Sequence, residues 1–373
     1  MKEQFNRLPR PTFKWMKVNA LELDVTKTEK PGSAFMRERH EGDAAVQFYN
    51  GNQLPDLGDF EGANKEALRE TLEDGNVNCR ITVPDGGRAS VWLVYEVSEA
   101  ATELVGQLYI DAGRDSELHL YTLFEGDAPH GLVNIFHYIQ TGDHARVTVS
   151  KVQVQSSRVR HIDQRLTRDG AGSQVKFVSA EIGGREAVIH VKAQLDHDDS
   201  EFRSQSMYLG TGEQVVDYSY WVPTKGCRTF TDILTTGALM DRSKKYFRGT
   251  IDFLRGGKKA VGSESDVCLL LNKGVHSISI PLLLCKEDDV EGNHASSSGQ
   301  VDQDMLFYLM SRGLSEAGAR LVIVESNIRP VIDQLGDEKL ENRAMQAVRE
   351  KMQVCYQKGE CDDQCAKRFP NLD

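Results

Sequence analysis

Residues 288–299 read DDVEGNHASSSG, and the character of the chain changes at this stretch. Before it, the apolar run at residues 275–285 alternates as in a strand. After it, Asp302 is a good helix N-cap and Gly313 a typical C-terminal glycine, which predicts a helix between them. His294 lies among small residues that we expect to form a hinge. The stretch therefore predicts a strand-rich part followed by a helical part.

Upstream, from about residue 89 to residue 285, polar and apolar residues alternate with a period of two. Glycine-bearing turns separate the predicted strands at spacings that look irregular. So long a series of strands without a helix exceeds one ordinary sandwich and leaves a large barrel, two sandwiches or a solenoid, of which the periodicity favours a β-solenoid. The clearest predicted strands are residues 91–95, 132–139, 145–154, 187–191 and 214–222.

The two ends of the chain differ from the strand-rich part. The N-terminal part is mixed, with a predicted helix at residues 65–72, and apolar faces at helical spacing follow residue 301. Pro330 and Gly336 should interrupt these helices, which are short enough to need the strands or a partner as a packing surface. The expected domains are an N-terminal segment (1–80), a strand core (81–298), a C-terminal α-helical domain (299–352) and a Cys-containing tail (353–373).

The composition limits the function classes. A formal net charge of −11 over 373 residues argues against nucleic-acid binding, which needs a basic surface. The N-terminus lacks the apolar core of a signal peptide, and no apolar run approaches the ~20 residues that span a bilayer, so we expect a cytoplasmic protein without membrane contact. The scattered Cys79, Cys227, Cys268 and Cys285 are expected to be buried reduced thiols.

Two further groups of residues could hold a metal, and a third resembles a paired-carboxylate active site. Cys355, Cys361 and Cys365 could bind zinc, iron or a cluster with a fourth ligand, but their spacing matches no strong motif, so an exposed flexible tail is preferred. Residues 196–199 (DHDD) resemble a metal cluster, but a charged turn is the preferred interpretation. Residues 287–289 (EDD) are expected to form a solvated turn, because adjacent strand carboxylates point to opposite sides.

Several motifs occur in a fixed order in the second half of the chain. They are RSKKYFRGTIDF (242–253), CLLL (268–271), DDV (288–290) followed by His294, LFYL (306–309) and SRG (311–313). In order and spacing they resemble the SufB/SufD family of iron–sulfur cluster assembly proteins, and SufD more than SufB. LPRPTFKW at residues 8–15 is also similar to an aromatic N-terminal stretch of SufD proteins.

This resemblance implies a right-handed parallel β-helix core, mainly β overall, followed by a helical domain that docks the ATPase SufC. A SufB-like chain would pair with the last coils near residues 285–298, and the subunit itself would perform no covalent catalysis. No tightly bound cofactor is implied; iron or an iron–sulfur cluster would bind transiently, and flavin stays open. The expected SufC-binding residues are Met305, Leu306, Tyr308, Leu309, Arg312 and Gly313.

The resemblance also places His294 on the family's SufD histidine, which implies contact with iron or a nascent cluster at the SufB interface. The alternative is a histidine that only hydrogen-bonds the hinge backbone. The chain departs from the family pattern nearby, at Gly292 and Ser265, where cysteines occur in relatives, and at Trp221, where a histidine is common. Glu264 and Asp266 replace Gln and Asn.

Two other functions stay open. The first is a self-sufficient SufB-like scaffold that works as a homodimer, which the missing cysteine near Ser265 disfavours and the Cys-containing tail favours. The second is a carbohydrate-active enzyme on a β-solenoid, which would need carboxylates or basic groups converging on a groove.

Overall fold

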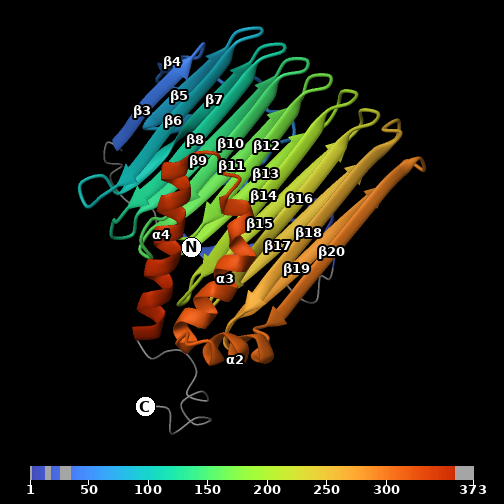
Figure 1. Cartoon of the computed structure of the whole chain (residues 1–373). Helices are drawn as coiled ribbons and strands as arrows, with labels where there is room; N and C mark the ends of the chain where they lie inside the picture. The colour runs from blue at the N-terminus through green and yellow to red at the C-terminus, as the bar shows by residue number, and fades with distance from the viewer. Residues whose placement is uncertain (1, 13–17, 26–34, 358–373) are drawn as a thin grey trace.

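The computed structural model describes residues 2–12, 18–25 and 35–357 (Figure 1). Two nine-stranded sheets lie against each other, and from β5 onward the chain passes from one to the other with each successive strand. The first, called here the even sheet, contains β3 (Phe35–Gly42), β6 (Arg88–Val97), β8 (Glu117–Gly126), β10 (Arg146–Gln153), β12 (Gln174–Glu181), β14 (Glu201–Gly210), β16 (Phe230–Leu239), β18 (Ala260–Leu270) and β20 (Val290–Gln300). The second, the odd sheet, contains β4 (Ala45–Phe48), β5 (Val77–Val83), β7 (Glu103–Ala112), β9 (Leu132–Thr141), β11 (Arg160–Arg168), β13 (Glu186–Gln194), β15 (Val215–Thr224), β17 (Lys244–Phe253) and β19 (His276–Cys285).

From β5 to β20 every pairing within a sheet is parallel and joins a strand to the one two places later, so the chain winds as a β-solenoid. Arg88 is paired with Glu117 and Glu117 with Arg146, so a coil here adds 29 residues. At the other end of the coils, β3 and β4 add antiparallel edges to the two sheets. The solenoid that the period-two pattern favours over a barrel or two sandwiches is confirmed.

The turns between strands repeat along with the coils. Asp115 and His144 occupy equivalent places in successive turns, and both have left-handed backbone, with φ of 54° and 57°. The Asp115 N–H donates to Asp143 O, and the His144 N–H donates to Ala171 O, so each turn is hydrogen-bonded to the next. The same conformation recurs at Asp199, which identifies residues 196–199 as a turn; there Arg228 forms ion pairs with Asp198 and Asp199.

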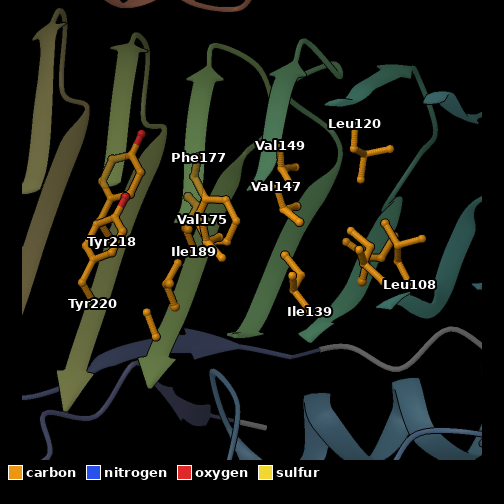
Figure 2. Close-up of a cluster of buried hydrophobic side chains, with 14 of the residues drawn as sticks. Leu108, Leu120, Ile139, Val147, Val149, Val175, Phe177, Ile189, Tyr218 and Tyr220 are labelled. Carbon is orange, nitrogen blue, oxygen red and sulfur yellow. The ribbon is translucent and has the colours of Figure 1, made fainter. Parts of the chain in front are cut away.

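The main core fills the space between the two sheets (Figure 2). Leu120, Val149 and Phe177 are in register on β8, β10 and β12, and all three are buried. Full burial of such a side chain contributes about 1.5–3 kcal/mol relative to exposure. Stacking like residues on like positions lets the coils share one continuous apolar interior.

Three C-terminal helices, α2 (Gln303–Ser311), α3 (Glu316–Ile332) and α4 (Glu338–Gln357), follow the solenoid. Asp302 caps α2, as predicted, by accepting from the Asp304 and Met305 N–H groups. The predicted interruption at Pro330 is wrong, because Pro330 lies inside α3 near its end, where neighbouring buried residues such as Val331 hold the last turn. A second apolar cluster joins α3 and α4 to the outer face of the even sheet, as Figure 1 shows.

The N-terminal segment covers the outer face of the odd sheet. It contains β1 (Lys2–Phe5), β2 (Leu21–Asp24) and α1 (Lys65–Glu73), whose side chains pack on that face with Ile162 and Val188. Of the four cysteines described, Cys79 and Cys268 are buried as predicted, whereas Cys227 is half-buried and Cys285 exposed; all four are free. No helix in the described ranges is long and apolar enough to span a membrane.

Candidate functional site

The solenoid ends at β19 and β20, and among the described residues no strand pairs with the outer edge of either. His294 lies in the middle of β20, so the expected hinge at residues 288–299 is wrong: most of it is the terminal strand. Alanine, serine and glycine are poor strand formers, but eleven registered pairs with β18 hold the segment extended. The unpaired edges of both sheets can accept further strands.

The side of β20 on which His294 lies follows from its neighbour Gly292. A Cβ placed on Gly292 would lie 3.1 Å from the Phe253 ring and 3.2 Å from Leu283, both of which pack on the main core. Alternate residues of a strand share a face, so His294 also lies on the interior side. It is exposed because the solenoid ends with its own coil.

Glu264 lies directly beside His294, as its register partner on β18. It is 1% exposed, and within the described ranges no side chain donates a hydrogen bond to its carboxylate. Burial raises the pKa of Glu264 to about 8, and the Leu282 backbone N–H offsets only part of that effect. The nearby buried cation, Lys245, is paired instead with Asp266. The sequence marks Glu264 only as a departure from the family pattern.

The other residues at which this chain departs from the family pattern lie elsewhere in the solenoid. Ser265 lies on the opposite face of β18 from Glu264 and is half-exposed. Trp221 lies on β15, where the Lys192 ammonium sits 4.2 Å from its ring centroid. Cys285 is paired with Phe253 at the end of β19. Among the described residues no cysteine therefore accompanies His294 on β20.

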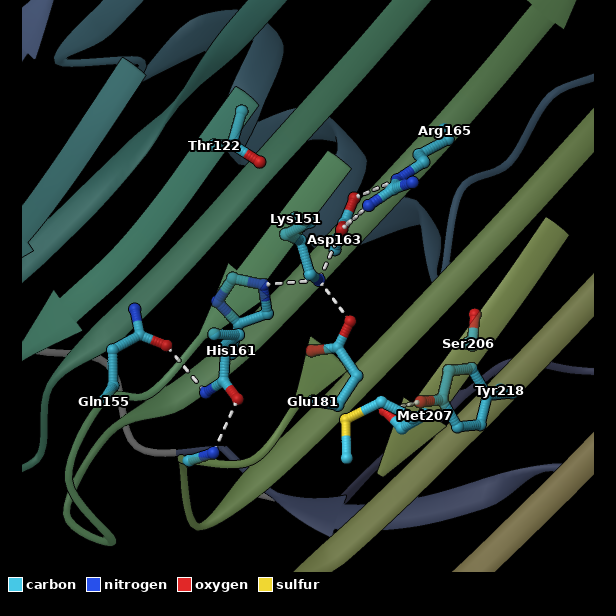
Figure 3. Close-up of polar contacts among 12 residues, drawn as sticks. Thr122, Lys151, Gln155, His161, Asp163, Arg165, Glu181, Ser206, Met207 and Tyr218 are labelled. Carbon is cyan, nitrogen blue, oxygen red and sulfur yellow. Dashed lines mark hydrogen bonds and ion pairs between the residues drawn. The ribbon is translucent and has the colours of Figure 1, made fainter. Parts of the chain in front are cut away.

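A fully buried group of charges lies deeper in the solenoid, between its middle coils (Figure 3). Lys151 Nζ lies 2.7 Å from both Asp163 Oδ2 and Glu181 Oε1, and Arg165 contacts Asp163 at 2.6 and 3.0 Å. Lys151 also donates to His161 Nε2 at 3.2 Å, which requires a neutral imidazole. Sequence reasoning missed this buried charge group.

The pKa values of these residues move in different directions. Burial alone would raise the pKa of Asp163, but Arg165 and Lys151 outweigh it and hold that pKa well below its usual range. For Glu181, burial prevails over Lys151 and the pKa is raised. Burial, together with Lys151, holds the pKa of His161 well below its usual value. Within the described part of the chain, no three or more His, Cys, Asp or Glu residues converge as a metal site.

The helix α2 presents apolar side chains to solvent. Phe307 is 67% exposed, and Met305 and Tyr308 of the same helix are 52% and 55% exposed; these three residues are called here the apolar patch. Such a cluster of large exposed side chains is typical of an interaction surface. The sequence prediction named Met305 and Tyr308 individually, and Phe307 only within the expected binding region of residues 305–314.

The remaining predicted partner-binding residues support the apolar patch from below or beside it. Leu306 is buried at 5% exposure, and Leu309 packs at the edge of the second apolar cluster. The Arg312 guanidinium lies 5.1 Å from the Tyr308 ring centroid. Gly313 has φ of 96°, a left-handed conformation that lets the chain leave α2 sharply.

The tail cysteines cannot be placed in a site. Cys355 belongs to α4, but the described side chains end before it, and Cys361 and Cys365 lie outside the described residues. Metal binding by this group stays a prediction.

Residues 95–327 match the family model described as "SUF system FeS cluster assembly, SufBD core domain". The chain is 27% identical over 220 residues to the iron–sulfur cluster assembly protein SufD of Bacillus subtilis, over 59% of this chain and 50% of that protein. It is 24% identical over 198 residues to SufD of Escherichia coli, over 53% and 46%. The matches thus span about half the length of these curated relatives.

Proposed function

This chain belongs to the SufBD core family of the SUF iron–sulfur cluster assembly system, and on that premise we propose that it is a non-catalytic, SufD-like subunit of a cytoplasmic SUF complex. Similarity to several relatives named SufD favours this subunit type. The match gives no support to the carbohydrate-active alternative. Two surfaces of the molecule fit such a subunit, one for each expected partner.

The apolar patch is the observation that carries the proposal. It fits the docking site for a SufC-like ATPase, because Phe307, Tyr308 and Met305 together offer large side chains that are more than half exposed. Aromatic anchors of this kind dominate binding free energy when a partner covers them. Leu306 and Leu309 hold α2 against the rest of the helical domain, so that the anchors are presented on a fixed surface.

The open end of the solenoid fits the site for a SufB-like chain. Both sheets end there in unpaired strand edges, and hydrogen-bonding a second solenoid to β19 and β20 would continue both sheets. The same edges could pair with a second copy of this chain, which keeps the homodimeric scaffold as the second candidate. His294 would contact iron or a nascent cluster bound transiently at this interface; no resident cofactor is proposed.

Anaerobic co-purification with the SufC and SufB counterparts tests the proposal. We expect the wild type to recover both partners, Arg312→Glu to lose SufC alone, and His294→Ala to keep both partners but hold less iron and sulfide. A complex of His294→Ala with unchanged iron and sulfide would remove the cluster role. A chain that recovers neither partner and runs as a homodimer with iron and sulfide would support the self-sufficient scaffold instead.

A further inference from the structure

A cavity of about 700 Å³, called here the N-terminal cavity, lies between the N-terminal segment and the outer face of the odd sheet. Strands β13 and β15 supply its floor, and residues 7–11 and 59–65 supply its walls. The volume is in the range of small-molecule sites, which is about 300–1,000 Å³. None of the lining residues belongs to α2 or to β20, so the cavity is separate from both surfaces proposed for partners.

A buried cation, Lys192, lies on the floor of the N-terminal cavity. Its side chain is 3% exposed, and its ammonium group donates to Asp59 Oδ1. Asp59, in contrast, is 72% exposed and belongs to the loop between β4 and α1. Because an exposed loop carboxylate can move without disturbing the sheet, Asp59 occupies a place that the carboxylate of a ligand could take.

Trp221 supplies a second polar group to the floor. Its indole N–H is buried and has no acceptor among the described residues, although a buried donor normally has one. The Lys192 ammonium lies over the same ring, 4.2 Å from its centroid. One carboxylate beside Lys192 can therefore also accept the Trp221 N–H.

The charges around the N-terminal cavity leave an excess of two positive charges. Each carboxylate that lines it has a cation as its partner: Glu61 pairs with Lys65, Asp252 with Lys286, and Asp59 with Lys192. Arg7 and Arg10 are exposed at the rim, and neither forms an ion pair with any residue of the described ranges. His190 adds no charge, because burial lowers its pKa to about 4. A chain with a net charge of −11 thus has a local site suited to an anion.

We propose that the N-terminal cavity binds a small dicarboxylate. One carboxylate takes the place of Asp59 on Lys192 and accepts the Trp221 N–H, and the second is bound at the rim by Arg7 and Arg10. A guanidinium group stays charged at physiological pH and can hold a carboxylate through two parallel hydrogen bonds. This site goes beyond the proposed assembly role and does not depend on it.

NMR of the isolated full chain, labelled with ¹⁵N-tryptophan and titrated with succinate, tests the site. The chain has three tryptophans, and the signal that is lost in Trp221→Phe identifies the Trp221 indole. We expect succinate to shift that signal saturably, because the N–H gains an acceptor. The Trp92 signal should stay in place, because its N–H already donates to Asp337 Oδ2. Absence of a saturable shift in both wild type and Asp59→Asn would overturn the proposal.

Three variants separate the parts of the site. Asp59→Asn removes the competing carboxylate and should tighten succinate binding by about tenfold, or about 1.4 kcal/mol. Lys192→Met should abolish binding. Arg10→Gln, a change at an exposed side chain that does not threaten the fold, should weaken succinate binding by about tenfold and leave the affinity for acetate unchanged. Arg146→Gln, at an exposed arginine on the even sheet, is the matched control and should bind as the wild type does.

The ligand class is decided by comparing succinate with acetate. In the wild type we expect succinate to bind more tightly, because only succinate reaches the arginines and Lys192 together. Equal affinity for the two would contradict a dicarboxylate site, as would wild-type succinate affinity in either Lys192→Met or Arg10→Gln. Since the measurement uses the isolated chain, failure to bind SUF partners leaves its outcome unaffected.

Discussion

Lys151 Nζ lies 2.7 Å from Asp163 Oδ2 in the solenoid interior, and both side chains are fully buried. The same ammonium contacts Glu181, so one lysine on β10 links carboxylates on β11 and β12 and thereby joins the two sheets. Around it the interior is largely apolar, as at Phe177. Removing one member therefore leaves charge without compensation in a medium that solvates it poorly.

We predict that Lys151→Met lowers the free energy of unfolding by about 3–5 kcal/mol, the usual cost of breaking a buried ion pair from one side. The measurement is urea unfolding followed by far-UV circular dichroism. Lys244→Met is the control: Lys244 is exposed at the start of β17, and its replacement should change stability by less than about 0.5 kcal/mol. Equal stability of Lys151→Met and wild type would mean that the charge group is solvated by water.

Truncation of two adjacent residues of α2 should change the free energy of unfolding by very different amounts. Leu306→Ala removes a buried side chain and should cost about 2–4 kcal/mol of unfolding free energy. Phe307→Ala removes a side chain that is 67% exposed and should change stability by less than about 0.5 kcal/mol. Differential scanning calorimetry separates the two; a large loss in Phe307→Ala would show that the residue is structural.

Phe307 should contribute strongly to the affinity for a SufC-like ATPase, although it contributes little to stability. We predict that Phe307→Glu weakens binding by roughly 30-fold, the effect of losing a hot-spot anchor worth about 2 kcal/mol. Isothermal titration calorimetry on folded variants measures this. Asp304→Asn, an exposed change on the same helix, serves as the control, and undiminished affinity of Phe307→Glu would place the docking site elsewhere.

The fold was largely predictable from sequence, but its coil length was not recognised. Gly113 and Gly142 are 29 residues apart and mark equivalent turns, which was a usable signal. Elsewhere the offset drifts, from Arg160 paired with Glu186 to Lys244 paired with His276, because turns on the two sides accept different loop lengths. Because the spacing between turns is irregular, the coil repeat is difficult to recognise in the sequence. The alternation of polar and apolar residues within each strand does not depend on that spacing.

The site was less predictable than the fold. The role expected for His294 came only from the resemblance to a family. The small residues around His294 wrongly indicated a hinge, because pairing with β18 holds this segment as a strand despite its poor strand propensity. Lys151 shares a strand face with Val147 and Val149, so its inward position could have been inferred. Its partners Asp163 and Glu181 could not, because they come from later strands that only the coil register brings together.

The repeated left-handed turns give a prediction that depends on backbone alone. Asp115 is exposed with φ of 54°, a conformation that β-branched residues adopt poorly. Asp115→Val should lower the free energy of unfolding by about 1–2 kcal/mol, whereas Asp115→Gly should be nearly neutral. Arg146→Val, at an exposed strand position, is the control and should not destabilise; thermal unfolding of all three decides whether turn conformation limits coil stability.

Glu264 should make stability depend on pH. Its pKa is about 8 in the folded chain against an ordinary 4.5, so between these values the folded state binds the extra proton and the unfolded state does not. Stability must then fall as pH rises through this window, with the full cost, roughly 5 kcal/mol, present above pH 8. Urea unfolding in EDTA from pH 5 to 9 should therefore show a shallower decline in Glu264→Gln than in wild type, with Glu291→Gln matching wild type. If Glu264→Gln declines as steeply as wild type, the carboxylate is ionised and compensated in the folded chain.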